Sequence, residues 1–251
     1  MIKRLTSIQH PLVKHLVKLR QNRDYRYNEQ SLLIEGIKPV EELVHNGRFK
    51  VIVVYNESMI PLGANADEVL LVNEAVMRKI SGMTTPEGVI VEMAMPQPSS
   101  LQSSRYVIAL DGVSDPGNVG TIIRSALALG WDGAFILNDS CDPFNEKALR
   151  AARGATFKLP LGWGSWDDLN RLIKTNGLKP MVADINGTEL SKVQGKSGSL
   201  LVLGNEAHGP SKEAKALCEA VTITMPGAME SLNVAVAGGI LMYALRQGKG
   251  T

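Results

Sequence analysis

SLLVLGNEAHGPSKEAKALCEAVTITMPGAMESLNVAVAGG, residues 199–239, carries the clearest structural pattern in the C-terminal part of the chain. It contains two short runs of apolar, β-type residues, 200–203 and 221–225, and each run ends in a loop that contains glycine. In an open α/β sheet, small ligands bind beyond the carboxyl ends of the strands, where glycine lets the backbone approach them closely. The stretch therefore predicts a ligand site built from two strand-end loops.

The second of these loops runs into Ser231-Leu232-Asn233, and residues 234–246 then have the composition of an apolar helix rich in alanine and glycine. Ser231 suits the N-cap position of this helix, which would bring its hydroxyl and the Asn233 amide to the same crevice. Two ordinary strand-to-helix turns with a capping serine would explain the pattern equally well, so the function has to be argued from further motifs.

Composition places the chain among soluble globular proteins long enough for two modest cores, with 251 residues of which 44% are hydrophobic. Cys141 and Cys218 lack C-x-x-C spacing and the four histidines form no cluster, so we expect neither a disulfide framework nor a metal site. The longest apolar run, 234–245, is too short and glycine-rich to cross a bilayer. We therefore expect a cytoplasmic protein without a membrane partner.

Basic residues are concentrated at the N-terminus, although the net charge of the whole chain is only +2. Residues 1–27 hold seven of them against the single acid Asp24: Lys3, Arg4, Lys14, Lys18, Arg20, Arg23 and Arg26. A helix predicted over residues 10–23 would present part of this charge on one face. Such a face can be merely solvated or can contact phosphate. If it binds RNA, the predicted contacts are Lys14, Lys18, Arg20 and Arg23.

A linker divides the chain into two predicted domains. Residues 96–104, PQPSSLQSS, are rich in proline and serine and show no apolar period. We therefore assign residues 1–95 to one compact α/β domain and residues 105–251 to another. In the second domain strands alternate with helices, which predicts a mostly parallel sheet.

A further motif follows the predicted strand 106–110. It lacks the G-x-G-x-x-G of dinucleotide-binding loops, and Asn118 stands where a P-loop counted from Gly112 would need lysine. What remains is Asn118-x-Gly120-x-x-x-Arg124. Taken alone, this pattern would be read as a helix cap and a surface arginine.

Together the motifs resemble those of the SpoU (TrmH) family of RNA ribose 2′-O-methyltransferases, in the SPOUT superfamily. Asn118-x-Gly120-x-x-x-Arg124 resembles motif 1, Gly204-x-Glu206 resembles motif 2 and Ser231-Leu232-Asn233 resembles motif 3, in the family's order and spacing. The likeness extends over about residues 106–246. Residues 33–36 and 84–88 also resemble the ribosomal-protein-like substrate-binding domain joined to many such enzymes. The chain departs from the family at Ala207, where a second glycine is usual, and at Ala152, where serine is common.

The resemblance implies a trefoil-knotted α/β fold for residues 105–251 and a homodimer. It implies that S-adenosylmethionine binds within the knot, largely through the backbone, at Leu203, Gly204, Met225 and Leu232. It also implies methyl transfer to a ribose 2′-hydroxyl. The residues expected to serve that reaction are Asn118, Arg124, Glu206, Ser231 and Asn233.

Arg124 is the family's catalytic arginine, yet guanidinium keeps its proton at any physiological pH. We therefore expect Arg124 to stabilise the developing alkoxide or the adjacent phosphate, with Glu206 orienting the guanidinium, while the proton passes to phosphate or water. The N-terminal domain favours 23S ribosomal RNA as substrate. Transfer RNA, a non-catalytic role in RNA binding or ribosome assembly, and a small-molecule enzyme with a nucleotide cofactor remain alternatives.

Overall fold

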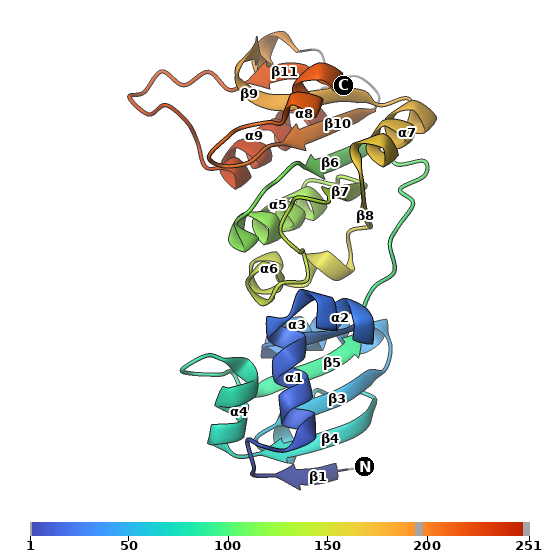
Figure 1. Ribbon diagram of the computed structural model, residues 1–251, viewed down its shortest axis with the longest axis vertical. Helices are drawn as coiled ribbons and strands as arrows, with labels where there is room; N and C mark the ends of the chain where they lie inside the picture. Colours follow the sequence, from blue (N-terminus) through green and yellow to red (C-terminus); the bar gives the residue numbers. More distant parts are fainter. Residues whose placement is uncertain (1, 194–197, 248–251) are drawn as a thin grey trace. The chain divides into compact units, whose positions relative to one another are not determined.

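The structure is a computed structural model that describes residues 2–193 and 198–247 (Figure 1). The chain folds into two compact units. The first comprises the described residues up to Gln97 together with Phe144–Arg150. The second comprises Pro98–Pro143 and the described residues from Ala151 onward. A short segment from the second half of the sequence thus belongs to the first unit.

A mixed five-stranded sheet forms the centre of the first unit. Its strands are β1 (Ile2–Leu5), β2 (Ser31–Glu35), β3 (Phe49–Val54), β4 (Ala66–Val72) and β5 (Val89–Ala94). Their order is β1-β4-β3-β5-β2, with β1 and β3 parallel to β4, and β5 antiparallel to β3 and β2. The helices are α1 (Pro11–Gln21), α2 (Arg23–Glu29), α3 (Ile37–Leu43) and α4 (Glu74–Ser81), with 3-10 helices at Val44–Asn46 and Glu57–Met59.

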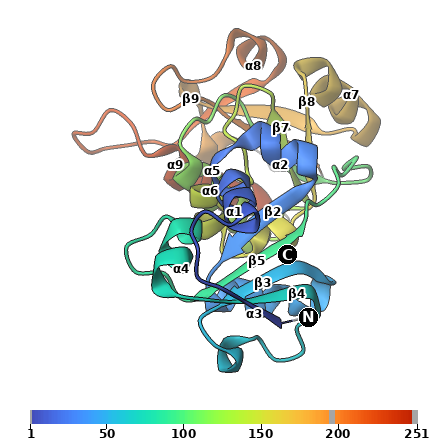
Figure 2. The same cartoon turned by 60° about the horizontal axis from the view of Figure 1, so that its bottom comes forward.

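Helices α1 and α4 lie against this sheet (Figure 2). They pack on it through their apolar stripes. The buried side chains they contribute are Val13, Leu16, Leu19, Val76, Met77 and Ile80. Lys14 and Lys18 lie on the opposite, exposed side of α1, as the helical spacing predicts. The helix predicted over residues 10–23 is interrupted at Asn22, whose backbone is extended and whose side chain accepts a hydrogen bond from the Tyr25 N–H. Asparagine is a preferred N-cap residue, so it ends α1 and starts α2.

Six parallel strands form the sheet of the second unit, as the alternation of strands and helices predicts. They are β6 (Tyr106–Leu110), β7 (Gly133–Leu137), β8 (Leu161–Gly164), β9 (Lys179–Glu189), β10 (Ser199–Leu203) and β11 (Glu219–Thr222), in the order β11-β9-β10-β6-β7-β8. Every residue of β6, β7 and β10 is buried, which suits a parallel sheet covered on both faces.

Helices connect these strands. They are α5 (Pro116–Ala128), α6 (Glu146–Ala152), α7 (Trp166–Asn176), α8 (Lys212–Leu217) and α9 (Val234–Gln247), with 3-10 helices at Ala155–Phe157 and Leu190–Lys192. Helix α9 packs against α5. Residues 155–157 form a 3-10 helix rather than a strand, and β8 follows it. Short apolar runs do not distinguish the two structures.

Two helix starts in this unit lie at the candidate site, and that of α9 differs from the one predicted. Helix α5 begins at Pro116, capped by Asp115, whose carboxylate accepts from the Asn118 N–H. Proline suits this first position because its missing N–H would have no partner there. Helix α9 is capped by Asn233 rather than Ser231, since the Asn233 side-chain oxygen accepts from the N–H groups of Ala235 and Val236.

Strand β9 carries a pronounced bulge beside β11. The partner of β11 changes from Val182, opposite Ala220, to Thr188, opposite Val221. Residues 183–187 therefore leave this ladder. Bulges often occur next to active sites, where they re-aim side chains. Within the described residues, no helix is long and apolar enough to cross a membrane.

Candidate functional site

The loop after β10 is tied to the start of α5 through the Glu206 carboxylate. This group accepts four hydrogen bonds: from the Ser114 N–H (3.0 Å) and hydroxyl (2.9 Å), from the Asp115 N–H (3.1 Å) and from the Asn118 side-chain amide (2.9 Å). A carboxylate has about four acceptor sites. Glu206 is therefore fully engaged by residues at the start of α5 and just before it.

These bonds keep Glu206 ionised. Partial burial raises the pKa of its carboxyl group, but the hydrogen bonds from Asn118, Ser114 and Asp115 outweigh this and lower the pKa from 4.5 to about 2. Glu206 thus carries a negative charge at any physiological pH and has no acceptor site left for another donor.

The expected pairing of Glu206 with Arg124 is wrong for this reason. The guanidinium of Arg124 is exposed on α5 and makes no hydrogen bond or ion pair within residues 2–193 and 198–247. Its charge is free to meet a ligand.

Asn118 joins the third motif to the other two. Its side-chain oxygen accepts a hydrogen bond of 2.9 Å from the Asn233 amide, while its own amide donates to Glu206. The structure therefore brings Asn118, Glu206 and Asn233 together in one chain of contacts. Ser231 stands outside this chain, exposed in the loop before α9.

A cavity of about 610 Å³ opens between the loops that follow β10 and β11, beside the bulge of β9. All four residues predicted to bind the cofactor line it: Leu203, Gly204, Met225 and Leu232. Glu206, Ser231 and Asn233 line it as well, whereas Asn118 and Arg124 do not. Its volume falls in the range of small-molecule sites.

Gly204 is required by the loop itself as well as by any ligand. A Cβ atom at this position would lie 2.5 Å from the Pro210 nitrogen, because the loop folds back through paired backbone hydrogen bonds between Asn205 and Gly209. Gly209 is the residue of this loop that has a left-handed backbone conformation, with φ of 68°. Ala207 has no positive φ, so alanine is compatible with the loop at the position where the family usually has glycine.

The residue types around the cavity fit S-adenosylmethionine. The apolar side chains of Ile223, Met225 and Leu232 suit an adenine ring, and the backbone of the Gly204 loop forms another part of the lining. Acidic side chains elsewhere in the lining suit a cationic group. No cluster of three or more metal-ligating side chains occurs in the described parts of the chain.

Ser114 and Asp115 are site residues that the motif search missed. Ser114 supplies two of the four donors to Glu206, and Asp115 supplies one. The Asp115-Pro116 pair is a helix-start signature, so this end of α5 could have been located from the sequence. The bond from Ser114 to a residue 92 positions later has no local signal.

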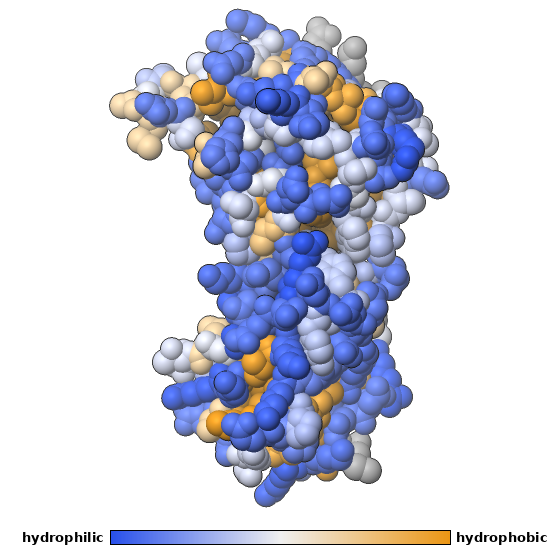
Figure 3. All heavy atoms as spheres, viewed as in Figure 1, coloured by the Kyte–Doolittle hydropathy of each residue, from blue (hydrophilic) through white to orange (hydrophobic). Residues whose placement is uncertain are grey.

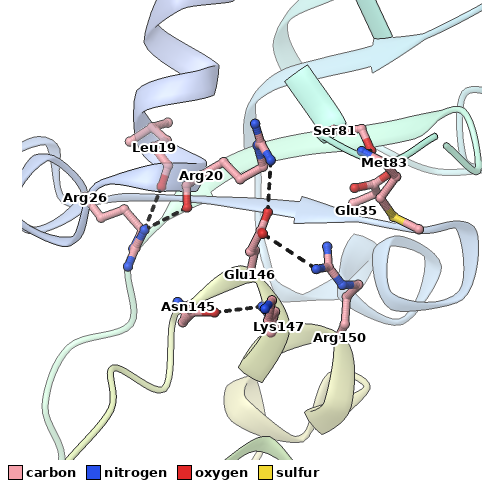
Figure 4. A network of polar contacts seen from close by, with 10 residues as sticks. All are labelled: Leu19, Arg20, Arg26, Glu35, Ser81, Met83, Asn145, Glu146, Lys147 and Arg150. Carbon is pink, nitrogen blue, oxygen red and sulfur yellow. Dashed lines mark hydrogen bonds and ion pairs between the residues drawn. The ribbon is translucent and has the colours of Figure 1, made fainter. Parts of the chain in front are cut away.

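The four predicted RNA-binding residues differ in their surroundings within the first unit. Lys14, Lys18 and Arg23 are exposed. The Arg20 side chain is only 13% exposed, and its Nη1 lies 3.4 Å from Glu146 Oε2 in a network that also contains Arg150 (Figure 4). The Arg20 guanidinium is thus mostly buried and already paired with a carboxylate of the first unit.

Arg26, which also belongs to the basic N-terminal segment, is buried. Its Nη1 donates to the carbonyl oxygens of Leu19 (2.9 Å) and Arg20 (3.1 Å), at the end of α1 (Figure 4). Its position therefore indicates a structural role.

Comparisons with known proteins agree with this geometry. Residues 105–243 match the model of the SpoU rRNA Methylase family, and residues 10–91 match the MRM3-like substrate binding domain. The chain is 32% identical to the 23S rRNA (guanosine(2553)-2′-O)-methyltransferase RlmP of Bacillus subtilis, over 98% of this chain and 100% of that protein.

It is also 30% identical to the 23S rRNA (adenosine(1067)-2′-O)-methyltransferase of Streptomyces laurentii, over 93% of this chain and 91% of that protein. Among solved structures, the AdoMet-bound rRNA methyltransferase from Sinorhizobium meliloti superposes with a TM-score of 0.86 at 28% identity, over 100% of this chain and 99% of that one. The predicted fold class, that of the SPOUT methyltransferases with an N-terminal substrate-binding domain, is confirmed.

The bonds to Glu206 predict a pH-dependent contribution to stability. Because its folded-state pKa of about 2 lies below 4.5, the carboxylate stabilises the fold above pH 4.5, and this contribution is lost as the pH falls from 4.5 to about 2. We expect urea unfolding to give a larger free-energy difference between wild type and Glu206→Gln at about pH 6.5 than at about pH 3.

The matched control is Glu230→Gln, at an exposed carboxylate of the same cavity that has no hydrogen-bond partner in the described chain. Its free-energy difference from wild type is expected to stay constant over the same interval. An equally constant difference for Glu206→Gln would contradict the stabilising role of the four bonds.

Proposed function

Because the chain belongs to the SpoU rRNA methylase family, we propose that it transfers a methyl group from S-adenosylmethionine to a ribose 2′-hydroxyl of RNA. The observation that carries this proposal is the Asn118 amide, which joins all three motifs at the rim of a cavity lined by the predicted cofactor-binding residues. A purely RNA-binding protein would have no need of this arrangement.

The proposed substrate is 23S ribosomal RNA, and the proposed compartment is the cytoplasm. Two relatives that match this chain over most of their length are named as 23S rRNA 2′-O-methyltransferases. Residues 1–95 serve as the RNA substrate-binding domain and residues 105–251 as the methyltransferase domain. These relatives favour ribosomal over transfer RNA.

The protein's chemical task is mainly alignment. S-adenosylmethionine supplies a methyl group that is already activated by the positive charge on sulfur. Holding two reactants in line can lower a barrier by about 7–11 kcal/mol. Asn118 and Asn233, fixed by their mutual hydrogen bond, provide rigid amide groups, and Ser231 adds a hydroxyl at the cavity.

Arg124 acts as an electrostatic donor. Its guanidinium keeps its proton, so it stabilises negative charge on the ribose oxygen or on the neighbouring phosphate. The hydroxyl proton passes to substrate phosphate or to water. Since Arg124 does not line the cavity, cofactor binding does not depend on it.

We expect Arg124→Ala to abolish methyl transfer while cofactor affinity stays within about twofold of wild type, because losing one such donor costs about 10²–10³ in rate. Ribose methylation is mapped across total RNA from cells that lack the gene. We expect one 23S rRNA position to lose its methyl group in these cells, and the wild-type gene to restore it where Arg124→Ala does not. Calorimetry with S-adenosylmethionine measures the affinity.

The matched control is Arg171→Ala, which removes an exposed arginine on α7. It is expected to leave both methylation and affinity unchanged. If Arg124→Ala weakened cofactor binding tenfold, the separation of roles would be wrong, and a restored position in transfer RNA would overturn the choice of substrate.

The exposed residues Lys14, Lys18 and Arg23 form the proposed RNA-docking patch of the N-terminal domain. Each phosphate contact that is lost reduces the slope of log affinity against log salt by about 0.7–0.9. Replacing all three residues by alanine is therefore expected to flatten that slope by about two units and to weaken binding similarly for different RNA sequences.

The control variant replaces Lys3, Arg48 and Arg78 by alanine and so removes the same number of positive charges from the same unit. Each of these three residues is already paired with an acidic side chain. Filter binding over a series of salt concentrations measures both slopes. Equal slopes for the two triple variants would show that the patch is only a solvated face.

Helix α9 supports the proposed homodimer. Val236, Ile240 and Tyr243 repeat at helical spacing and are exposed, and Met229 is exposed in the loop before the helix. That loop projects from the second unit in the space-filling view (Figure 3). An exposed apolar stripe of this kind is typical of an interface.

We expect Ile240→Asp to convert a dimer into a monomer, because a charge would be buried without a partner. Sedimentation analysis measures the mass. Leu62→Asp changes the most exposed leucine of the first unit and is expected to leave the mass unchanged. A dimeric Ile240→Asp protein would exclude this face as the interface.

A further inference from the structure

The bulge of β9 delivers a charged side chain to the cavity. Residues 183–187 leave the ladder with β11, and Asp184, Ile185 and Asn186 line the cavity as a result. Gly187 ends the bulge, and a Cβ atom there would lie 2.6 Å from the backbone of Ala220. The close contact between the two strands thus fixes the position of the bulge.

The carboxylate of Asp184 is held rigidly within the bulge. Its Oδ1 accepts hydrogen bonds from the backbone N–H (2.9 Å) and the side-chain amide (3.4 Å) of Asn186. Only 10% of the side chain is exposed. Its Oδ2 lies 3.5 Å from the Lys215 ammonium group, whose side chain is 54% exposed and therefore well hydrated.

Asp184 is the most buried of the three carboxylates that line the cavity. Three carboxylates line it, those of Asp184, Glu206 and Glu230, against the single ammonium group of Lys215. Glu206 is exposed and accepts four hydrogen bonds from Ser114, Asp115 and Asn118, and Glu230 is exposed to solvent. Interactions between charges grow stronger as the surrounding water is removed. The buried Asp184 carboxylate therefore acts on a charge inside the cavity more strongly than an exposed carboxylate does, although Lys215 offsets part of this effect.

The proposed cofactor and its product differ in charge. S-adenosylmethionine carries a sulfonium, an ammonium and a carboxylate group, and is therefore a cation. Loss of the methyl group turns the sulfonium into a neutral thioether, so S-adenosylhomocysteine carries no net charge. A fixed carboxylate stabilises the first molecule more than the second.

We propose that Asp184 determines the preference of the cavity for the sulfonium cofactor over the demethylated product, and so favours release of the product after each transfer. This inference rests on the proposed function. Lys215 opposes Asp184, because its positive charge partly cancels the attraction.

The test is isothermal titration of the full-length protein with S-adenosylmethionine and, separately, with S-adenosylhomocysteine. Asp184→Asn keeps the shape of the side chain and an oxygen for the Asn186 N–H, but removes the charge. We expect the affinity for S-adenosylmethionine to fall about tenfold, because one attraction that Lys215 already partly offsets is lost, and that for S-adenosylhomocysteine to change less than about twofold.

Two further variants sharpen the test. Lys215→Met is expected to change the ratio of the two affinities in the opposite direction, in favour of S-adenosylmethionine. Glu189→Gln serves as the control and removes another carboxylate of β9. This carboxylate lies 3.2 Å from the Lys192 ammonium group and does not line the cavity. The control variant is expected to leave the ratio as in wild type.

The results separate this inference from the function on which it rests. If wild type binds both molecules and Asp184→Asn leaves the ratio of the two affinities unchanged, the role of Asp184 is overturned while the proposed function stands. If wild type binds neither molecule, the proposed function fails as well. The binding of S-adenosylhomocysteine also reports whether the variant cavity is intact.

Discussion

The Asn118 side chain is the point on which the candidate site depends. Its amide donates to Glu206, 88 positions later in the chain, and its oxygen accepts from Asn233, 115 positions later. An amide engaged at both ends has one orientation. Hydrogen bonds to a charged partner contribute about 1.5–3 kcal/mol each, against about 0.5–1.5 kcal/mol for neutral pairs, so the link to Glu206 is the stronger one. These two hydrogen bonds therefore hold the loops after β10 and β11 in fixed positions relative to the start of α5.

Close packing of main chain against main chain is the second constraint. At Gly204 and at Gly187 an added Cβ atom would lie within 2.6 Å of a neighbouring backbone atom. One of these glycines lines the cavity, and the other closes the bulge that lines it. Much of the cavity wall is therefore set by backbone geometry. Side chains such as Asp184 are left to supply charge, which is the property that distinguishes a sulfonium ligand from its neutral product.

Local signals were sufficient to predict most of the fold. The apolar run 106–110 coincides with β6, and the glycine-bearing loops after the last two strands do form one cavity. Long-range contacts were not predictable in the same way. Arg20 has the same sequence signal as the exposed Lys14, yet the structure pairs it with Glu146, 126 positions away. Likewise, Ser231 and Asn233 are both residue types that cap helices and stand two positions apart, and only the observed hydrogen bonds show that α9 is capped by Asn233.

The contacts of Glu206 also explain why Arg124 is available for chemistry. An arginine paired with that carboxylate would have to exchange its partner for RNA before it could act. In the structure Ser114, Asp115 and Asn118 satisfy the carboxylate, so the charge of Arg124 is not neutralised. Arg124 lies on the exposed face of α5, and its five N–H donors are open to a substrate. Its full positive charge can attract a phosphate group and then stabilise the oxygen that loses its proton. Because Glu206 binds Ser114, Asp115 and Asn118 rather than Arg124, the catalytic charge stays free.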